Sequence, residues 1–231
     1  MDFIPFAIIS AVSYLVGGVP FALLVGKVFY RTDIRQHGSG NLGATNVFRV
    51  LGWKAGLAVF LLDAGKGALA VSAASFLSPH PPGEIMQDVT YIIGAIMAVL
   101  GHSYSPFIRF RGGKGVATAS GALLIITPLA WLVMLVVFIG VVAASKMVSL
   151  GSIIIATIYP ALSLLIYPDR PAIFVLALIT AALVIWRHRM NIKRIMKGQE
   201  SKIFDKSTLL SASAEVEPAE VKVDESEDRG Q

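Results

Sequence analysis

The chain has 231 residues, of which 55% are hydrophobic and 15% are charged, and its mean hydropathy is +0.70. A composition this apolar excludes an ordinary water-soluble domain. The absence of cysteine excludes disulfides, thiolate nucleophiles and zinc held by cysteine. The four histidines lack the spacing of a local metal pair, so we expect neither a metal nor a cofactor.

The net charge of +5 is unevenly distributed along the chain. Residues 211–231 contain seven acidic and two basic residues, a balance of −5, which leaves +10 for residues 1–210. We predict a membrane-embedded domain over 1–210 and an acidic, disordered tail over 211–231, because the tail has few large apolar residues to bury. The excess of basic residues in 1–210 is compatible with nucleic acid, anionic lipid or an anionic substrate as the partner. Because such an apolar chain has little soluble surface on which to bind nucleic acid, we expect anionic lipid or an anionic substrate.

Long apolar runs predict an all-α integral membrane protein. The clear runs, of about the length that crosses a bilayer, are 3–26, 55–78, 89–108, 147–167 and 171–186. The stretch 116–144 is predicted to form two helices, because Pro128 removes a backbone donor and disfavours helix at Thr127. We therefore predict about seven transmembrane helices, of which the one over 114–127 is too short to cross the full hydrocarbon layer.

The basic residues predict how these helices are oriented. With seven helices, the basic segments 27–54, 109–114 and 187–206 fall on one side of the membrane, whereas Arg170 is the base expected on the other side. Loops rich in Lys and Arg stay in the cytoplasm. We therefore predict an N-terminus outside and a C-terminus in the cytoplasm.

Three polar segments lie on the predicted inner side. In 37–49, glycines permit a close backbone approach, and Ser, Asn, Thr and Arg side chains offer donors to a phosphate. In 101–118, a Gly-Gly-Lys-Gly turn before an apolar helix is expected to present free N–H groups and Lys114 to an anion. This turn is not a Walker A loop, because Ile108 stands where that motif requires glycine. In the third segment, which is 187–194 followed by Gly198-Gln199-Glu200, His188 and Asn191 share one helical face.

Asp63 and Lys66 lie three residues apart in an otherwise apolar run. Ionisable groups at such a depth are costly and are usually paired or functional. Their spacing fits an internal ion pair, direct chemistry, or the relay of a carrier for an anionic solute, which is the competing class of function. A carrier concentrates its polar residues near the midplane, whereas the glycine-rich motifs here gather at one face.

Five sequence blocks occur together in order: SGNLGATNVFRVLG, DAGKG, GHSYSPFIRFRGGKGVAT, KMVSLGS, and RHRMNIKR followed by GQE. Over about residues 1–206 the chain resembles the bacterial acyl-phosphate-dependent glycerol-3-phosphate acyltransferases. The resemblance implies a multi-pass enzyme of phospholipid synthesis in the bacterial inner membrane, with its active site facing the cytoplasm. It implies transfer of an acyl chain from acyl phosphate to the 1-hydroxyl of sn-glycerol 3-phosphate, which forms lysophosphatidic acid and inorganic phosphate. The partners are these two substrates and membrane lipids. Gln199 departs from the family, which often has threonine there.

The matched blocks also imply which residues form the site. The residues expected to bind the phosphates and to act in catalysis are Ser39, Arg49, Lys114, Ser149, His188 and Asn191. The polar segments and the DAGKG block add residues expected to bind substrate, namely Gly40, Asn41, Thr45, Asn46, Lys66, His102, Arg111, Gly112 and Gly113. The attacking hydroxyl must lose a proton, either to His188 or to a substrate phosphate oxygen, and the resemblance points to the phosphate. A different lipid-phosphate transferase is the remaining alternative, and acyl-chain preference and oligomeric state are not predicted.

Overall fold

The computed structural model describes residues 3–81 and 83–203, and all regular secondary structure in this part of the chain is helical. The predicted tail over 211–231 lies outside the described residues. The elements, in chain order, are α1 Ile4–Gly18, α2 Phe21–Tyr30, η1 Ile34–Gln36, α3 Ala44–Leu51, α4 Trp53–Leu77, α5 Ile85–Ser103, η2 Pro106–Ile108, α6 Val116–Ile126, α7 Pro128–Ser145, α8 Val148–Ile166, α9 Pro171–Arg187 and α10 Arg189–Met196.

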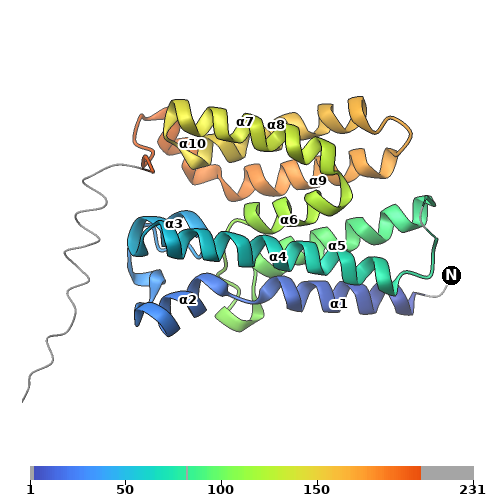
Figure 1. The fold of residues 1–231 in the computed structure, drawn as a ribbon, viewed down its shortest axis with the longest axis horizontal. Helices are drawn as coiled ribbons and strands as arrows, with labels where there is room; N and C mark the ends of the chain where they lie inside the picture. The colour runs from blue at the N-terminus through green and yellow to red at the C-terminus, as the bar shows by residue number, and fades with distance from the viewer. Residues whose placement is uncertain (1–2, 82, 204–231) are drawn as a thin grey trace, which may run out of the picture.

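The long helices form two groups, as Figure 1 shows. Helices α1, α4 and α5 pack together in one group, and α7, α8 and α9 form the other, with α6 between the two. Glycines allow α6 to approach α4 closely. A Cβ at Gly67 would lie 1.9 Å from the Thr118 carbonyl oxygen, and one at Gly121 would lie 1.8 Å from that of Ala64. Small residues permit such backbone contact between membrane helices.

The lengths of the helices agree with the prediction of an all-α membrane protein. The segments long and apolar enough to cross a membrane are Ile4–Tyr30, Trp53–Leu77, Ile85–Ile108, Pro128–Ser145 and Val148–Ile166. A further candidate is α9 together with α10, which are bent by 61°. Helix α6 has 11 residues. At about 1.5 Å per residue it is roughly 16 Å long, about half of the hydrocarbon thickness. The predicted short helix is therefore confirmed.

Prolines divide two of the apolar runs. The break at Thr127-Pro128 is confirmed, because α6 ends at Ile126 and α7 begins at Pro128. The predicted apolar run over 3–26 lies within the candidate span Ile4–Tyr30, but that span contains two helices. Helix α1 ends at Gly18, and α2 begins at Phe21 after Pro20, whose ring prevents a regular helix. The Val19 carbonyl oxygen, released by this break, accepts a hydrogen bond of 2.9 Å from Lys66 Nζ.

The basic segments gather at one end of the bundle. Figure 1 shows α2, α3 and α10 at this end, and the N-terminus at the opposite end. Arg170 lies between α8 and α9 and forms an ion pair with Asp88 near the start of α5. This arrangement agrees with the charge asymmetry predicted from the sequence, while the assignment of the basic end to the cytoplasm stays a prediction.

Candidate active site

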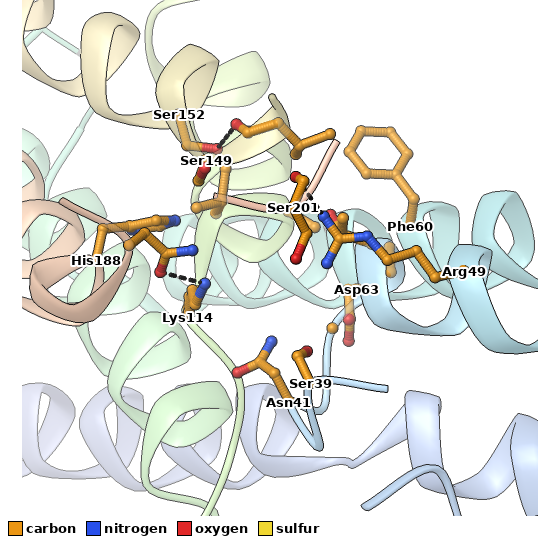
Figure 2. Close-up of a pocket in the computed structure, with 18 of the residues that line it drawn as sticks. Ser39, Asn41, Arg49, Phe60, Asp63, Lys114, Ser149, Ser152, His188 and Ser201 are labelled. Atoms are coloured by element: carbon orange, nitrogen blue, oxygen red, sulfur yellow. Dashed lines mark hydrogen bonds between the residues drawn. The ribbon is translucent and has the colours of Figure 1, made fainter. Parts of the chain in front are cut away.

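A polar cavity of about 180 Å³ lies near the end of the bundle that carries α3 and α10. Figure 2 shows that its side chains come from parts of the chain that are far apart in sequence. The cavity is lined by every member of the predicted catalytic set, namely Ser39, Arg49, Lys114, Ser149, His188 and Asn191. Of the predicted substrate-binding residues, Asn41, Thr45 and His102 line it as well.

The loop before α3 carries Ser39 into the cavity wall. Asn46 holds this loop, because its Oδ1 accepts hydrogen bonds from the Ser39 N–H at 2.8 Å and from Ser39 Oγ at 3.1 Å. Asn46 Nδ2 donates to the carbonyl oxygens of His37 and Ile34, and the side chain is fully buried. Asn46 therefore positions Ser39 and does not take the expected place in the substrate cavity. Gly40, whose φ is +66°, shapes the same loop without lining the cavity.

The glycine turn before α6 positions Lys114 differently from the expectation. The N–H groups of Gly112 and Gly113 donate to the carbonyl oxygens of Ser103 and His102, each at 3.1 Å, so the prediction that they are free is wrong. Their own carbonyl oxygens accept hydrogen bonds from Arg187.

The N–H groups that are placed to face an anion lie further along the chain, at the start of α6. Gly115, with φ of +80°, precedes the helix, and Gly115, Val116 and Ala117 line the cavity. The first N–H groups of a helix have no partner within the helix and attract anions. Arg111 is exposed and does not line the cavity, so it lies away from the predicted contact.

Glu200 connects polar side chains of α8 and α10. Its Oε1 accepts hydrogen bonds from Asn191 Nδ2 at 2.6 Å and from Ser149 Oγ at 2.8 Å, and its Oε2 accepts one from Arg194 Nε at 2.8 Å. Asn191 Oδ1 in turn accepts a hydrogen bond of 2.7 Å from Lys114 Nζ. The ammonium group of Lys114 is thus held by a chain of hydrogen bonds that ends at a carboxylate.

The residues after α10 fold back across the cavity. Gly198 adopts φ of +66°, which turns the chain, and the Ser201 carbonyl oxygen then accepts a hydrogen bond of 3.1 Å from Arg49 Nη2. The Ile203 N–H donates to the Lys146 carbonyl oxygen at 2.8 Å, which ties the segment to the α7–α8 junction. We call residues 198–203 the return segment. It brings Glu200 and Ser201 to the cavity wall.

The cavity favours anions, because Arg49, Lys114 and Arg194 line it. Burial lowers the pKa of Lys114 to about 8, with Glu200 opposing that shift and the nearby arginines adding to it. Burial also lowers the pKa of Arg49 from its ordinary value, and its buried Nε makes no hydrogen bond within the described residues. Burial acts to raise the pKa of Glu200, but hydrogen bonds from Asn191 and Ser149 hold it below its usual value. A dianion would relieve this accumulation of positive charge.

Asp63 and Lys66 form the internal ion pair that their spacing allows. Lys66 Nζ lies 2.8 Å from Asp63 Oδ1, and both side chains are almost completely buried. Lys66 does not line the cavity, so the substrate contact expected of it is replaced by this pair and by the bond to Val19. Asp63 does line the cavity, as does His102, whose Nδ1 lies 3.6 Å from Asp63 Oδ1.

His188 has a defined orientation at the end of α9. Its Nδ1 lies 2.8 Å from the Val184 carbonyl oxygen, and the imidazole is buried. Because a carbonyl oxygen can only accept, Nδ1 carries the proton in the neutral ring. Nε2 is then left as a hydrogen-bond acceptor, and His188 lines the cavity (Figure 2).

An apolar pocket of about 100 Å³ adjoins the polar cavity. Both are lined by Phe60, Val116, Phe138 and Ser152, so the two lie side by side. From this junction the pocket extends along α6 to Leu123, along α7 to Trp131 and along α8 to Tyr159. Seven residues of helix separate the two ends on each of these helices, which is about 10 Å.

Comparison with known proteins identifies the family. The family model described as glycerol-3-phosphate acyltransferase matches residues 7–198. The chain belongs to the glycerol-3-phosphate acyltransferase family. A glycerol-3-phosphate acyltransferase of Geobacillus kaustophilus is 43% identical over 199 residues, which are 85% of this chain and 95% of that protein. Glycerol-3-phosphate acyltransferase 2 of Bacillus anthracis is 46% identical over 191 residues, covering 83% of this chain and 95% of its own length.

Solved structures of this family share the fold. The glycerol 3-phosphate form of PlsY (YgiH), an integral membrane glycerol 3-phosphate acyltransferase, is 35% identical with a TM-score of 0.78 and covers 89% of this chain and 98% of that one. The lysophosphatidic acid form is 33% identical with a TM-score of 0.75 and has the same coverage. The resemblance recognised in the sequence blocks, and with it the all-α membrane fold, is confirmed.

Several residues of the glycerol-3-phosphate acyltransferase cavity were not in the predicted set. Glu200 and Ser201 reach it because the return segment folds back, and Arg194 lines it from α10, where it donates to Glu200; no local spacing indicates these contacts. The GQE block, which contains Glu200, was the available signal for this region. Ser152 lies at the junction with the apolar pocket, although serines within membrane helices often bond only within their own helix, as Ser152 does to the Val148 carbonyl oxygen.

Proposed function

We propose that this glycerol-3-phosphate acyltransferase takes its acyl chain from acyl phosphate and transfers it to the 1-hydroxyl of sn-glycerol 3-phosphate. The products are lysophosphatidic acid and inorganic phosphate. The observation that carries the proposal is the junction of a cation-lined cavity with an apolar pocket. An acyl phosphate has these two chemistries joined by one carbonyl group. The relatives and solved structures support the glycerol 3-phosphate half of the reaction by their names.

In this proposal the phosphates are held by the cations and by the start of α6. Arg49 offers a planar fork of donors, and Lys114 offers an ammonium already oriented by Asn191. Arg194 is held on Glu200. Ser39, Asn41 and Thr45 supply neutral donors on the opposite wall, as Figure 2 indicates for Ser39 and Asn41. Such fixed donors stabilise charge that develops at the reacting centre, without reorganisation.

The apolar pocket accepts the part of the acyl chain nearest to the carbonyl. This places the carbonyl carbon at the junction near Ser152 and Phe138, with its phosphate in the cationic cavity. The 1-hydroxyl oxygen attacks the carbonyl carbon, the new ester bond forms, and the bond from that carbon to the phosphate oxygen breaks. Phosphate is a good leaving group, so the carbon–oxygen cleavage needs little acid catalysis.

Two groups can take the proton of the attacking hydroxyl. One is Nε2 of His188, which its tautomer leaves as an acceptor, and the other is an oxygen of the departing phosphate. Replacement of His188 by glutamine separates them. A loss of about 10² to 10⁴ in kcat identifies His188 as the general base, whereas a loss below about tenfold assigns the proton to the phosphate.

The location of the protein also belongs to the proposal. We propose that it resides in the bacterial inner membrane with the cavity on the cytoplasmic side, as supported by the basic segments at the α3 and α10 end. The division into a membrane domain over 1–210 and an acidic tail over 211–231 is proposed from composition. The membrane lipids that surround the protein are then its immediate partners.

The decisive experiment offers the purified protein one acyl donor at a time. Acyl phosphate, acyl-CoA and acyl carrier protein of equal chain length are each incubated with labelled glycerol 3-phosphate, and lysophosphatidic acid and phosphate are quantified. We expect product from acyl phosphate, with phosphate released in equal amount. Turnover with acyl-CoA or acyl carrier protein, and none with acyl phosphate, would refute the proposed donor and leave the family assignment intact.

A further inference from the structure

Asp63 is a carboxylate inside a cavity that otherwise favours anions. It lies in the middle of α4, its residue is only 1% exposed, and it lines the cavity with Arg49 and Lys114. Figure 2 shows its carboxylate directed toward the side of the cavity that carries Ser39 and Asn41. The placement calls for an explanation, because a negative charge opposes the binding of phosphate.

The hydrogen-bonding capacity of Asp63 is not satisfied within the described residues. Lys66 Nζ lies 2.8 Å from Oδ1, but the ammonium also donates to the Val19 carbonyl oxygen and lies 5.7 Å from the centre of the Phe21 ring. His102 Nδ1 lies 3.6 Å from Oδ1, beyond hydrogen-bond distance. Oδ2 is buried and has no hydrogen-bond partner there. An ionised carboxylate can only accept, so it requires a donor that these residues do not supply.

We propose that Asp63 accepts a hydrogen bond from the 2-hydroxyl of glycerol 3-phosphate and thereby determines the choice of acceptor. This inference rests on the proposed function. The substrate has a phosphate at one end and two hydroxyl groups at the other. Cations attract the phosphate while a carboxylate repels it and attracts hydroxyl donors. The opposed charges in one cavity therefore fix the direction in which the molecule lies, and direct the 1-hydroxyl toward the acyl carbonyl.

Lys66 and His102 are positioning residues in this scheme. Lys66 holds Oδ1 and leaves Oδ2 for the substrate. His102 is confined between Asp63 and the glycine turn, since a Cβ at Gly113 would lie only 2.1 Å from His102 Nε2. The carboxylate is therefore held by rigid neighbours, which is the condition under which a single hydrogen bond discriminates strongly between substrates.

The first test uses the unaltered protein and three acceptors. Glycerol 3-phosphate is compared with 3-hydroxypropyl phosphate, which lacks the 2-hydroxyl, and with dihydroxyacetone phosphate, which has a carbonyl there. Neither analogue can donate from this position. We expect kcat/KM to fall by about 10 to 10² for both, as expected for the loss of a hydrogen bond to a charged group. Equal kcat/KM values for the three acceptors would overturn the inference.

The second test asks whether Asp63 causes the discrimination. In Asp63→Asn we expect the ratio of kcat/KM for glycerol 3-phosphate over 3-hydroxypropyl phosphate to fall at least fivefold. If that variant does not fold because Lys66 is left without its counter-ion, the double variant Asp63→Leu, Lys66→Met removes both buried charges, and such replacements are commonly tolerated. The matched control is Asp88→Asn, which breaks an ion pair with Arg170 at the opposite end of the bundle and should leave the ratio unchanged.

The ratio separates this role from a structural one. If Asp63 only supported the fold, its replacement would reduce activity on every acceptor equally and the ratio would stay as in the parent protein. That result, with both variants folded, would overturn the inference while leaving the proposed function in place. Absence of any transfer from acyl phosphate to glycerol 3-phosphate by the parent protein would instead refute the proposed function itself.

Discussion

Replacement of Lys114 by alanine tests the cationic cavity most directly. The ammonium of Lys114 lies beside Asn191 at 2.7 Å and shares the cavity with Arg49 and Arg194. At an effective dielectric constant of about 20, two unit charges about 4 Å apart attract by about 4 kcal/mol. Loss of one preorganised donor commonly reduces turnover by about 10² to 10³, which corresponds to about 2.7 to 4 kcal/mol. We expect a loss in this range for Lys114→Ala, because two arginines remain to hold the phosphates.

The pH dependence provides an independent measure of the same charge. Burial lowers the pKa of Lys114 to about 8, so the free protein loses this charge as the pH rises through 8. A phosphate monoester has its second pKa near 6 and is already a dianion there. We therefore expect kcat/KM for glycerol 3-phosphate to decline above about pH 8. The Lys114→Arg variant keeps its positive charge at this pH, so its residual activity should not show this decline. Its activity should still be below that of the parent protein, because a planar guanidinium places its charge differently from a compact ammonium.

The assay measures phosphate release from acyl phosphate in detergent or bilayer discs between pH 6 and 10. Lys197→Ala is the matched control, because this exposed lysine lies on the same end of the bundle and does not line the cavity. It should keep activity within about twofold, a change in barrier of less than ~0.5 kcal/mol. Folded Lys114→Ala with more than a third of the parent activity, or a parent profile that stays flat to pH 10, would refute the reasoning.

Three further predictions concern topology, the acyl pocket and the tail. A cysteine in place of Glu84 should react with a membrane-impermeant thiol reagent in intact cells and one in place of Lys202 should not; the reverse pattern would invert the orientation. Ala156→Phe fills the apolar pocket and should reduce kcat/KM for a long-chain acyl phosphate at least tenfold more than for a short-chain one, and an unchanged chain-length profile would remove the pocket from the acyl site. Truncation after Leu210 should keep turnover within about twofold, since residues 211–231 lie outside the matched sequence blocks; a tenfold loss would show that they contact the site.

Local chemistry explains what the sequence could predict. Pro128 ends α6 because a proline within the helix would lack its donor, and the three-residue spacing of Asp63 and Lys66 places them on one helical turn as an ion pair. The cavity was predictable in outline, because the basic and glycine-rich segments all fall on one side of the predicted helices. The same rule about proline applies to Pro20, where the apolar run concealed a break between α1 and α2.

Contacts between distant segments explain what the sequence could not predict. Glu200 joins Ser149 and Asn191 only through the turn at Gly198. The donors of Gly112 and Gly113 appear free in the sequence, yet they are used by the end of α5, whose last carbonyl oxygens need partners of their own. Glycine is needed here because the turn packs directly against the end of α5: a Cβ at Gly112 would lie 1.9 Å from the His102 carbonyl oxygen. The spacing of residues in the sequence does not predict such contacts between distant segments.

The shortness of α6 determines how the product can leave. Because α6 joins the far end of α7 and has only 11 residues, its first turn at Val116 lies inside the bundle (Figure 1), which the proposed topology places below the membrane surface. In the proposed reaction the ester bond is therefore made where lipid headgroups give way to hydrocarbon. The newly acylated molecule already has its head and tail aligned with the surrounding leaflet, so it can depart sideways between the helices, and its long chain never passes through water. Release would then be controlled by the fluidity of the bilayer and not by the viscosity of the surrounding solution.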